Sequence, residues 1–176
     1  KGEFQAWYQP KYDIRTHQIT GAEALVRWQS AELGFLPPGR FIPLFEKNGF
    51  VIPLDYYLLE AACRLQKQRL EEGKLVVPIS VNQSRLHITE EDYLEKIHAV
   101  VKKYNLPPGL LELELTETVF GDFDQAETRE HARGIIRSLH SMGFKISVDD
   151  FGSGYSSYML LNYLPLDVMK IDRSML

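Results

Sequence analysis

Alternating apolar and polar residues open the chain and predict two β-strands. The alternation covers Phe4–Gln9 and Ile19–Trp28, both rich in aromatic and β-branched residues, with a polar turn at 15–17 between them. We expect these two strands to pair as a hairpin. The pattern then changes to helical spacing, which predicts two helices ended by glycines, over Pro38–Asn48 and Pro53–Glu72.

Strands and helices alternate in the rest of the chain. Apolar runs predict strands at Val76–Asn82, Leu111–Thr116, Phe144–Asp149 and Val168–Ile171, with helices between them at Glu90–Tyr104, Asp124–Met142 and Ser156–Tyr163. Such alternation is typical of an α/β protein whose parallel sheet curls towards a barrel. A closed (β/α)₈ barrel needs eight strands and about 250 residues. We therefore expect one domain over residues 1–176, an incomplete barrel of about six strands.

Several of these apolar runs contain, or end in, one side chain with a polar oxygen or nitrogen. In a sheet of strands joined by helices, side chains at the strand ends leave the packed core and face an open cavity. Oxygen ligands and a lysine would then meet at one mouth, which predicts a metal site. The side chains concerned are Gln9, Glu23, Asn82, Glu114, Asp149 and Lys170.

Two adjacent aspartates in KISVDDFGSGYSS give the strongest local signal. Asp149 and Asp150 end an apolar strand, and two like charges there raise each other's pKa unless cations relieve the repulsion. They are natural ligands of a two-metal site. Glycines 152 and 154 let the following loop approach a ligand. The alternative, one aspartate capping a helix that begins near Ser156, accounts for a single carboxylate.

The other polar positions each have a structural alternative. Glu23 and Arg27 share one face of a strand, where they could hold a metal and a phosphate or form a salt bridge with each other. Asn82 could cap the next turn or offer its carbonyl oxygen to a hard cation. Alternation in LELELTET places Glu112 and Glu114 on one face, and a buried glutamate is expensive unless paired or metal-bound.

Lys170 is a charged residue in a strand whose other residues are apolar and suited to a hydrophobic core. It could bridge to the nearby Asp167 or Asp172, which is the structural alternative. Desolvation would lower the pKa of its ammonium, as expected for a general base or a group that orients water.

Composition narrows the class of protein. The 176 residues are 44% hydrophobic, enough for one sizeable core. The net charge of -4 makes duplex nucleic acid an unfavourable partner. No apolar run is long enough for a bilayer span or a secretory signal, so we expect no membrane contact from this segment. The single cysteine, Cys63, is expected to be a buried structural thiol in a cytoplasmic setting.

Six segments taken in order resemble the signature segments of the EAL domain, a family of cyclic di-GMP phosphodiesterases. They are GAEALVRW, FIPLFEKNG, SVNQS, LELELTET, SVDDFGSGYSS and MKIDRS, and they extend over essentially the whole chain. The resemblance implies a TIM-like barrel with its first strand antiparallel. It also implies hydrolysis of one phosphodiester of cyclic di-GMP to linear pGpG.

The resemblance further implies roles for individual residues. Glu23, Asn82, Glu114 and Asp149 would bind one Mg²⁺ or Mn²⁺ ion, and Asp149 and Asp150 would share a second. Lys170 would orient or deprotonate the attacking water, and Glu117 would anchor the loop that contains Phe151, Gly152, Ser153 and Gly154. Arg27 would contact a phosphate, with Gln9 and Glu46 near the nucleotide.

The chain departs from the family pattern after the lysine strand. The glutamate of the seventh strand and the glutamine turn of the eighth are missing, so a ligand of the second metal is lost and Phe4–Gln9 and Val168–Ile171 would be open edges. We expect a longer protein, or a second chain as in a dimer, to cover them, and this fragment to be inactive or weakly active alone.

Two further expectations stay open at this point. The whole protein could carry a regulatory or diguanylate cyclase domain or a membrane anchor. The alternative function is a catalytically silent cyclic di-GMP receptor or protein-interaction module.

Overall fold

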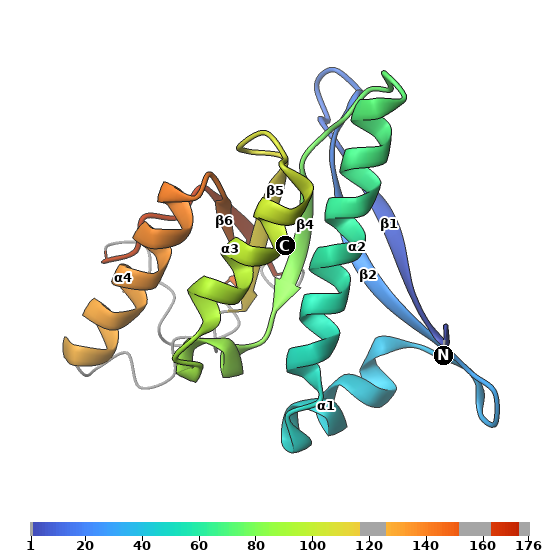
Figure 1. The fold of residues 1–176 in the computed structure, drawn as a ribbon, viewed down its shortest axis with the longest axis horizontal. Helices are drawn as coiled ribbons and strands as arrows, with labels where there is room; N and C mark the ends of the chain where they lie inside the picture. The colour runs from blue at the N-terminus through green and yellow to red at the C-terminus, as the bar shows by residue number, and fades with distance from the viewer. Residues whose placement is uncertain (1, 117–125, 152–162, 173–176) are drawn as a thin grey trace.

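In the part of the chain that the structure describes, seven strands form one sheet, with helices packed along it (Figure 1). The computed structural model describes residues 2–116, 126–151 and 163–172. The strands are β1 (Phe4–Tyr12), β2 (Ile19–Ser30), β3 (Gly34–Leu36), β4 (Ile79–Gln83), β5 (Leu111–Thr116), β6 (Lys145–Phe151) and β7 (Val168–Ile171). The helices are α1 (Pro38–Asn48), α2 (Val51–Glu71), α3 (Tyr93–Tyr104) and α4 (Ala126–Ser141), with a 3₁₀ turn η1 (Arg85–Thr89).

The strand order is β1-β2-β4-β5-β6-β7, and β3 pairs with β2. β1 runs antiparallel to β2, whereas β2, β4, β5, β6 and β7 are parallel to their neighbours along this path. This is the predicted α/β, TIM-like arrangement with a reversed first strand. Within the described ranges β1 and β7 each pair on one side only, so the barrel is incomplete and these two strands are its edges, as expected.

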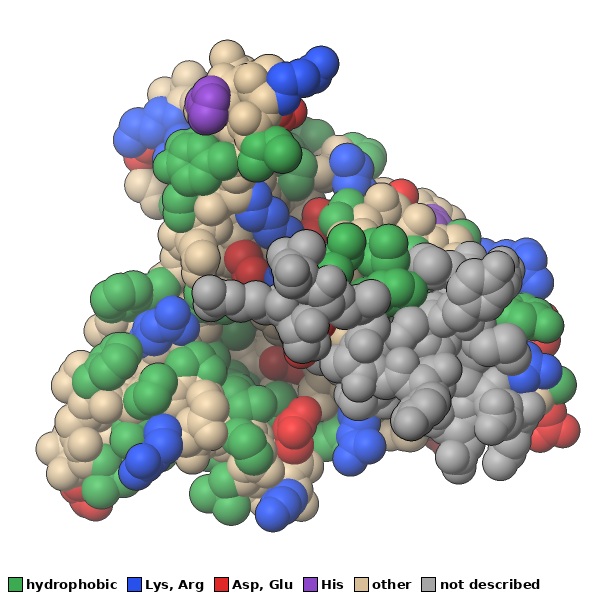
Figure 2. All heavy atoms as spheres, turned by 180° about the vertical axis from the view of Figure 1, so that it is seen from behind, with side chains coloured by type: hydrophobic (Ala, Val, Ile, Leu, Met, Phe, Trp, Pro, Cys, Tyr) green, Lys and Arg blue, Asp and Glu red, His purple; other side chains and the backbone are tan. Residues whose placement is uncertain are grey.

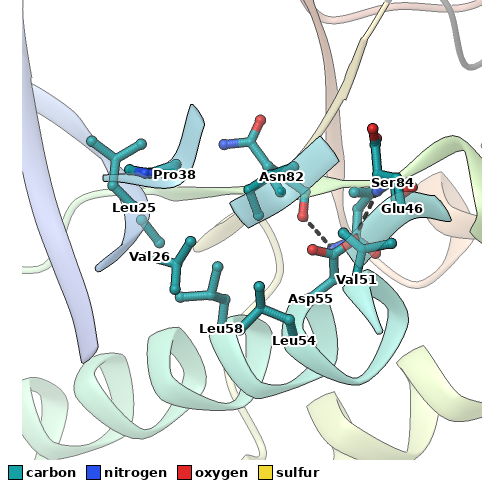
Figure 3. Close-up of a pocket in the computed structure, with 13 residues that line it drawn as sticks. Leu25, Val26, Pro38, Glu46, Val51, Leu54, Asp55, Leu58, Asn82 and Ser84 are labelled. Atoms are coloured by element: carbon teal, nitrogen blue, oxygen red, sulfur yellow. Dashed lines mark hydrogen bonds between the residues drawn. The ribbon is translucent and has the colours of Figure 1, made fainter. Parts of the chain in front are cut away.

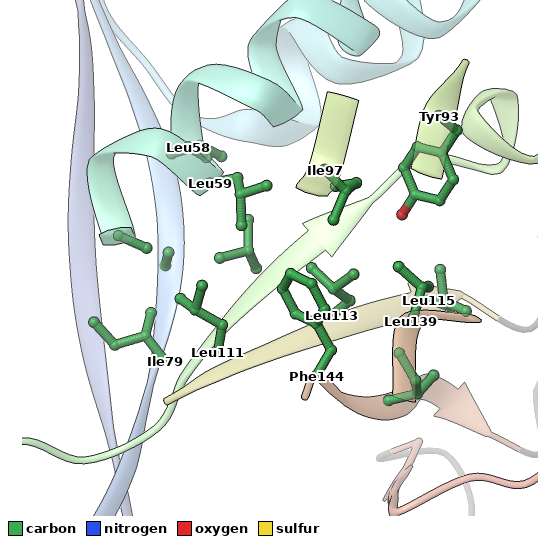
Figure 4. Packing of buried hydrophobic residues seen from close by; sticks show 14 of the residues in the cluster. Leu58, Leu59, Ile79, Tyr93, Ile97, Leu111, Leu113, Leu115, Leu139 and Phe144 are labelled. Atoms are coloured by element: carbon green, nitrogen blue, oxygen red, sulfur yellow. The ribbon is translucent and has the colours of Figure 1, made fainter. Parts of the chain in front are cut away.

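Leucine, isoleucine and valine side chains fill the space between the strands and the helices (Figure 4). Leu113 on β5 and Ile97 on α3 are fully buried there, and so is Leu59 on α2. Alternation then turns Glu112 and Glu114 of β5 towards the opposite side, the barrel interior. The strand that positions the candidate site is thus fixed by its own leucines.

Cys63 lies buried on α2, as predicted for a structural thiol. Burial raises its pKa to about 12, which keeps the thiol protonated. No helix within the described ranges combines the length and apolar character needed to cross a bilayer.

Several element boundaries differ from the sequence-based expectation. β4 begins at Ile79 instead of Val76, because Pro78 has no N–H and the Val77 carbonyl accepts a hydrogen bond from Gln66 Nε2 at 2.7 Å. Helix α3 begins at Tyr93 instead of Glu90, because Glu90 has an extended backbone (φ -80°, ψ 122°) at the end of the preceding 3₁₀ turn. β3 was not predicted. The helix expected at Ser156–Tyr163 and the start of the one expected at Asp124–Met142 fall on residues outside the described ranges.

Helix α4 is followed by a close approach of two loops. Gly143 has φ +89°, and a Cβ atom placed on it would lie 2.7 Å from the Cβ of Pro108. Its carbonyl accepts a hydrogen bond from the Gly109 N–H at 2.8 Å. Glycine is required here both for the backbone angle and for the contact.

Candidate active site

Five parallel strands deliver one polar side chain each to the same end of the sheet. Because parallel strands end at one edge, side chains near their carboxyl ends come close together although they are far apart in sequence. The side chains that meet are Glu23 of β2, Asn82 of β4, Glu114 of β5, Asp149 of β6 and Lys170 of β7.

The Lys170 ammonium lies among three carboxylates. Its Nζ is 3.0 Å from Glu23 Oε2 and 3.2 Å from Asp149 Oδ2, and it donates a hydrogen bond to Glu114 Oε1. Asp167 instead accepts hydrogen bonds from His140 and from the Ile146 N–H, so a Lys170–Asp167 bridge is not formed.

The charge state of Lys170 differs from the expectation based on burial alone. Burial does act to lower its pKa, but the contacts with Glu114 and Glu23 outweigh it and raise the pKa above the ordinary value of 10.5. The side chain is therefore an ammonium that donates hydrogen bonds. The sequence-based view of a lysine with a lowered pKa was wrong, because it included desolvation but not the three carboxylates.

Glu114 is the most enclosed of the carboxylates, with 0% of the residue exposed. Burial raises its pKa to about 7, although the Lys170 ammonium acts in the opposite direction. Its Oε2 accepts no hydrogen bond from any residue that the structure describes. A buried carboxylate oxygen with spare acceptor capacity fits a site built for a positive charge.

The available donors are hard oxygens. Three carboxylates and one side-chain amide converge, which suits Mg²⁺ or Mn²⁺ better than zinc. In the described part of the chain no three His, Cys, Asp or Glu side chains are set around a single ion position. The carboxylates are arranged around the Lys170 ammonium instead.

Asn82 does not cap the turn that follows it. Ser84 performs that role by accepting a hydrogen bond from the Leu86 N–H, while Asn82 Nδ2 donates to Glu23 Oε1 at 3.2 Å. The amide is thus part of the polar cluster, as the ligand interpretation of SVNQS requires.

The two adjacent aspartates lie in a β-bulge of β6. The pairing of β6 with β7 shifts register between Val148 and Phe151, and Asp150 adopts φ +55°. Asp150 is exposed, and its pKa is raised by burial and by repulsion from Asp149. Repulsion from Asp149 thus acts on Asp150, in the direction that the sequence predicted. Of the predicted loop, Phe151 is half-buried, while Gly152, Ser153, Gly154 and the anchor Glu117 lie outside the described residues.

Arg27 does not pair with Glu23. In the described residues its guanidinium forms no ion pair, and its Nη1 donates to the Val26 carbonyl at 2.8 Å. Gln9 stands opposite Glu23 in the β1–β2 register. The predicted nucleotide contacts on these two strands therefore share one side of the sheet with Glu23.

A pocket of about 210 Å³ opens beside the cluster (Figure 3). β2 pairs with β4 only from Ala22 to Ala24, and the two strands then part, so that α1 and the start of α2 close the gap. Asn82 lies at its centre, between Leu25 and Val26 on one side and Ser84 and Glu46 on the other. The pocket is mostly apolar with a few polar groups, as is usual for a small-molecule site.

A buried acidic and histidine cluster supports one wall of this pocket. Asp55 Oδ2 accepts a hydrogen bond from the Ser84 N–H at 2.8 Å and shares a hydrogen bond with His87 Nε2 at 3.0 Å. His87 is 1% exposed, and its Nδ1 lies 2.6 Å from Glu90 Oε2. Burial raises the pKa of Asp55, against the effect of the His87 hydrogen bond. The cluster fixes Ser84, two residues beyond Asn82.

Sequence reasoning missed Lys11. Its Nζ lies 3.1 Å from Glu112 Oε1 and 3.8 Å from Glu114 Oε2, so it supplies positive charge beneath the polar cluster. The alternation of β1 gave a signal, because Lys11 shares the inward face with Gln9. Its partner strand, about a hundred positions away, could not be known from the pattern.

Comparison with known proteins agrees with the fold. The family model described as "EAL domain" matches residues 1–176. The cyclic di-GMP phosphodiesterase PA2567 of Pseudomonas aeruginosa is 33% identical over 97% of this chain and 28% of its own length. The bifunctional diguanylate cyclase/cyclic di-GMP phosphodiesterase MucR of the same organism is 36% identical over 94% of this chain and 24% of its own length.

Solved structures give the same result. The MucR phosphodiesterase in complex with c-di-GMP superposes with a TM-score of 0.87 at 34% identity, covering 98% of this chain and 68% of that one. The FimX EAL domain of Pseudomonas aeruginosa, at 18% identity and a TM-score of 0.81 over 98% of this chain and 66% of that one, shows the shared fold. The chain spans only 21% and 24% of the first two curated relatives. On the family match over its full length, this chain belongs to the EAL domain family.

Proposed function

We propose that this domain, as part of the full-length protein, hydrolyses cyclic di-GMP to linear pGpG in a reaction that depends on Mg²⁺ or Mn²⁺. The observation that carries the proposal is the meeting of Glu23, Glu114 and Asp149 around Lys170, from four separate strands. The printed names of the relatives PA2567 and MucR support the same substrate and reaction.

The metal ligands in this proposal are Glu23, Asn82, Glu114 and Asp149, with Asp150 assisting at a second ion. Two features support this assignment: the donors are hard oxygens, and Oε2 of buried Glu114 accepts no hydrogen bond within the described ranges, its cation partner Lys11 Nζ lying 3.8 Å away. Held by these residues, a divalent ion would lower the pKa of a bound water and offset charge on the leaving oxygen.

The protein's own groups position the substrate and the water. Arg27 faces the same side as Glu23 and forms no ion pair in the described ranges, so it is available to bind a phosphate. Water attacks phosphorus, the bond from phosphorus to the 3′ oxygen breaks, and that oxygen takes up a proton. Because contacts with carboxylates keep Lys170 charged, we assign it the role of orienting the water by donating a hydrogen bond, instead of removing a proton.

The pocket beside Asn82 is the proposed position of one guanine base. Its apolar walls include Leu25 and Val26, and Glu46 offers a carboxylate to the hydrogen-bond donors on the base edge. Gln9, opposite Glu23, lies on the same side of the sheet and is the second proposed nucleotide contact.

The test is turnover of cyclic di-GMP by the intact protein with Mg²⁺ or Mn²⁺, with pGpG followed by chromatography. Glu23→Gln and Lys170→Met should each lower turnover about 100-fold or more. Lys102→Met, at an exposed lysine on α3, is the matched control and should leave turnover unchanged. Absence of turnover with either metal would defeat the proposal.

A second candidate function is a receptor that binds cyclic di-GMP without hydrolysing it. The observation in its favour is that the Lys170 ammonium already pairs with all three carboxylates and so offsets part of their repulsion without an ion. Calorimetry that detects binding by the intact protein, together with no pGpG in the turnover assay, would select this function.

A further inference from the structure

Two exposed aromatic rings stand beside Arg27. Trp7 on β1 and Phe35 on β3 are each 53% exposed, and their ring centroids are 6.5 Å apart. The Arg27 Cζ lies 5.7 Å from the centroid of the Trp7 ring. We call Trp7, Phe35 and Arg27 the aromatic shelf.

The strand register places the aromatic shelf on the same side of the sheet as the candidate active site. Gln9 stands opposite Glu23, and Trp7 stands opposite Leu25. Alternate residues of a strand share a face, and a two-residue step is about 7 Å. Trp7 therefore lies one such step along β1 from Gln9, which pairs with Glu23.

Trp7 is a large aromatic side chain on the exposed face of β1, between the exposed residues Gln5 and Gln9. The aromatic neighbours Phe4 and Tyr8 on β1 turn to the helix side and pack against the core. Figure 2 shows hydrophobic side chains gathered at the lower left, beside a hollow in which acidic side chains are visible. An exposed apolar patch with polar groups at its rim is typical of a binding surface.

The chemistry of the aromatic shelf indicates the ligand. An aromatic face stacks on a nucleobase, and a guanidinium binds the phosphate next to it. Arg27 forms no ion pair within the described ranges although carboxylates lie nearby, so its charge is available for an anion.

We propose that Trp7 stacks one purine base of the cyclic dinucleotide while Arg27 binds the adjacent phosphate. This inference rests on the proposed function and adds a binding residue to it. Leu25 faces Trp7 in the register and also lines the pocket beside Asn82. The two bases of one ligand would therefore lie on either side of Leu25, one in the pocket and one on the aromatic shelf.

The experiment combines tryptophan fluorescence with calorimetry on the intact protein, with a chelator present to prevent turnover. Cyclic di-GMP should quench the emission of the wild-type protein saturably. Trp7→Phe keeps an aromatic face but removes the reporting indole, so the quenching should be lost while calorimetry gives a Kd close to that of the wild type.

Trp7→Ala removes the stacking face and should raise the Kd about tenfold. Tyr12→Ala is the matched control, because Tyr12 is an exposed aromatic residue at the far end of the same strand, and its Kd should stay at the wild-type value. Inorganic phosphate, which has no base to stack, should not quench the emission.

Two results would overturn the inference, and they differ in what else they affect. If calorimetry detects binding, but Trp7 emission does not respond and Trp7→Ala binds as tightly as Tyr12→Ala, the aromatic shelf has no role while the proposed function stands. If the wild-type protein neither binds cyclic di-GMP in this experiment nor turns it over with Mg²⁺ or Mn²⁺, the proposed function and this inference fail together.

Discussion

Asn82 Nδ2 donates a hydrogen bond to Glu23 Oε1 across 3.2 Å, and so joins two side chains 59 positions apart in the sequence. The contact holds the end of β4 against β2 next to the point where these strands part to form the pocket. An amide can satisfy a carboxylate in this position, whereas a second carboxylate would repel it.

Asn82→Asp tests this relationship. The substitution places a fourth carboxylate in the cluster, so the protein in a chelator should unfold more easily, by about 1 to 3 kcal/mol. Because cations relieve such repulsion, Mn²⁺ should raise the melting temperature of this variant more than that of the wild type. Equal gains for the two proteins in a thermal melt would contradict the assignment of these residues as metal ligands.

Lys11→Met should destabilise the protein through Glu112. The substitution leaves the buried Glu112 carboxylate without its ammonium partner, which should lower the free energy of unfolding by about 1 to 3 kcal/mol. Glu112→Gln in the same chain should recover part of the loss. Urea unfolding of the two single variants and the double variant measures the coupling, and strict additivity would show that the ion pair contributes nothing.

Glu90 makes the stability of the protein depend on acid pH. Burial acts to raise its pKa, but hydrogen bonds from Lys96 and His87 overcome this and hold the pKa below 4.5. A lowered folded-state pKa gives stability that is present above pH 4.5 and lost as the pH falls through the folded value.

Glu90→Gln should therefore flatten the decline in unfolding free energy between neutral pH and pH 3, measured by urea unfolding at several pH values. The neighbouring exposed Glu91→Gln is the matched control and should keep the wild-type slope. If both variants decline as the wild type does, the His87–Glu90 contact does not control acid stability.

Gly143→Ala and Gly134→Ala should have opposite effects. The first puts a Cβ 2.7 Å from that of Pro108 at a positive φ, so it should cost about 1 to 3 kcal/mol. The second lies inside α4 with open space around it and should stabilise the helix by about 0.5 to 1 kcal/mol. The melting temperatures of the two variants, compared with that of the wild type, show whether each substitution destabilises or stabilises the protein.

Periodicity was enough to predict the strands that carry most of the site. Leu111, Leu113 and Leu115 fixed both the bounds and the facing of β5, which is why the inward position of Glu114 was predictable. β3 was missed because it has only three residues, one of them glycine, and so short a segment shows no recognisable alternation. Its pairing with β2 is a tertiary contact.

The charge environment of Lys170 lay beyond sequence reasoning for a physical reason. Asp167 and Asp172 were the visible partners because they are close in the chain, whereas Glu23 and Glu114 reach the ammonium only through the curl of the sheet. Local sequence thus identified the lysine as unusual but not what surrounds it. Lys11 and Trp7 show the same limit, since their neighbours come from β5 and β3.

The bulge in β6 also constrains how this chain can change length during evolution. Successive residues of a regular strand point to opposite faces, so two consecutive carboxylates can share one rim only where the pleat is interrupted, as it is at Asp150. The bulge consists of Asp149 and Asp150 themselves, which lie between the paired positions Val148 and Phe151, so deleting a single residue there removes one of the two carboxylates. A lineage that lost the bulge in this way would keep one aspartate at this strand end.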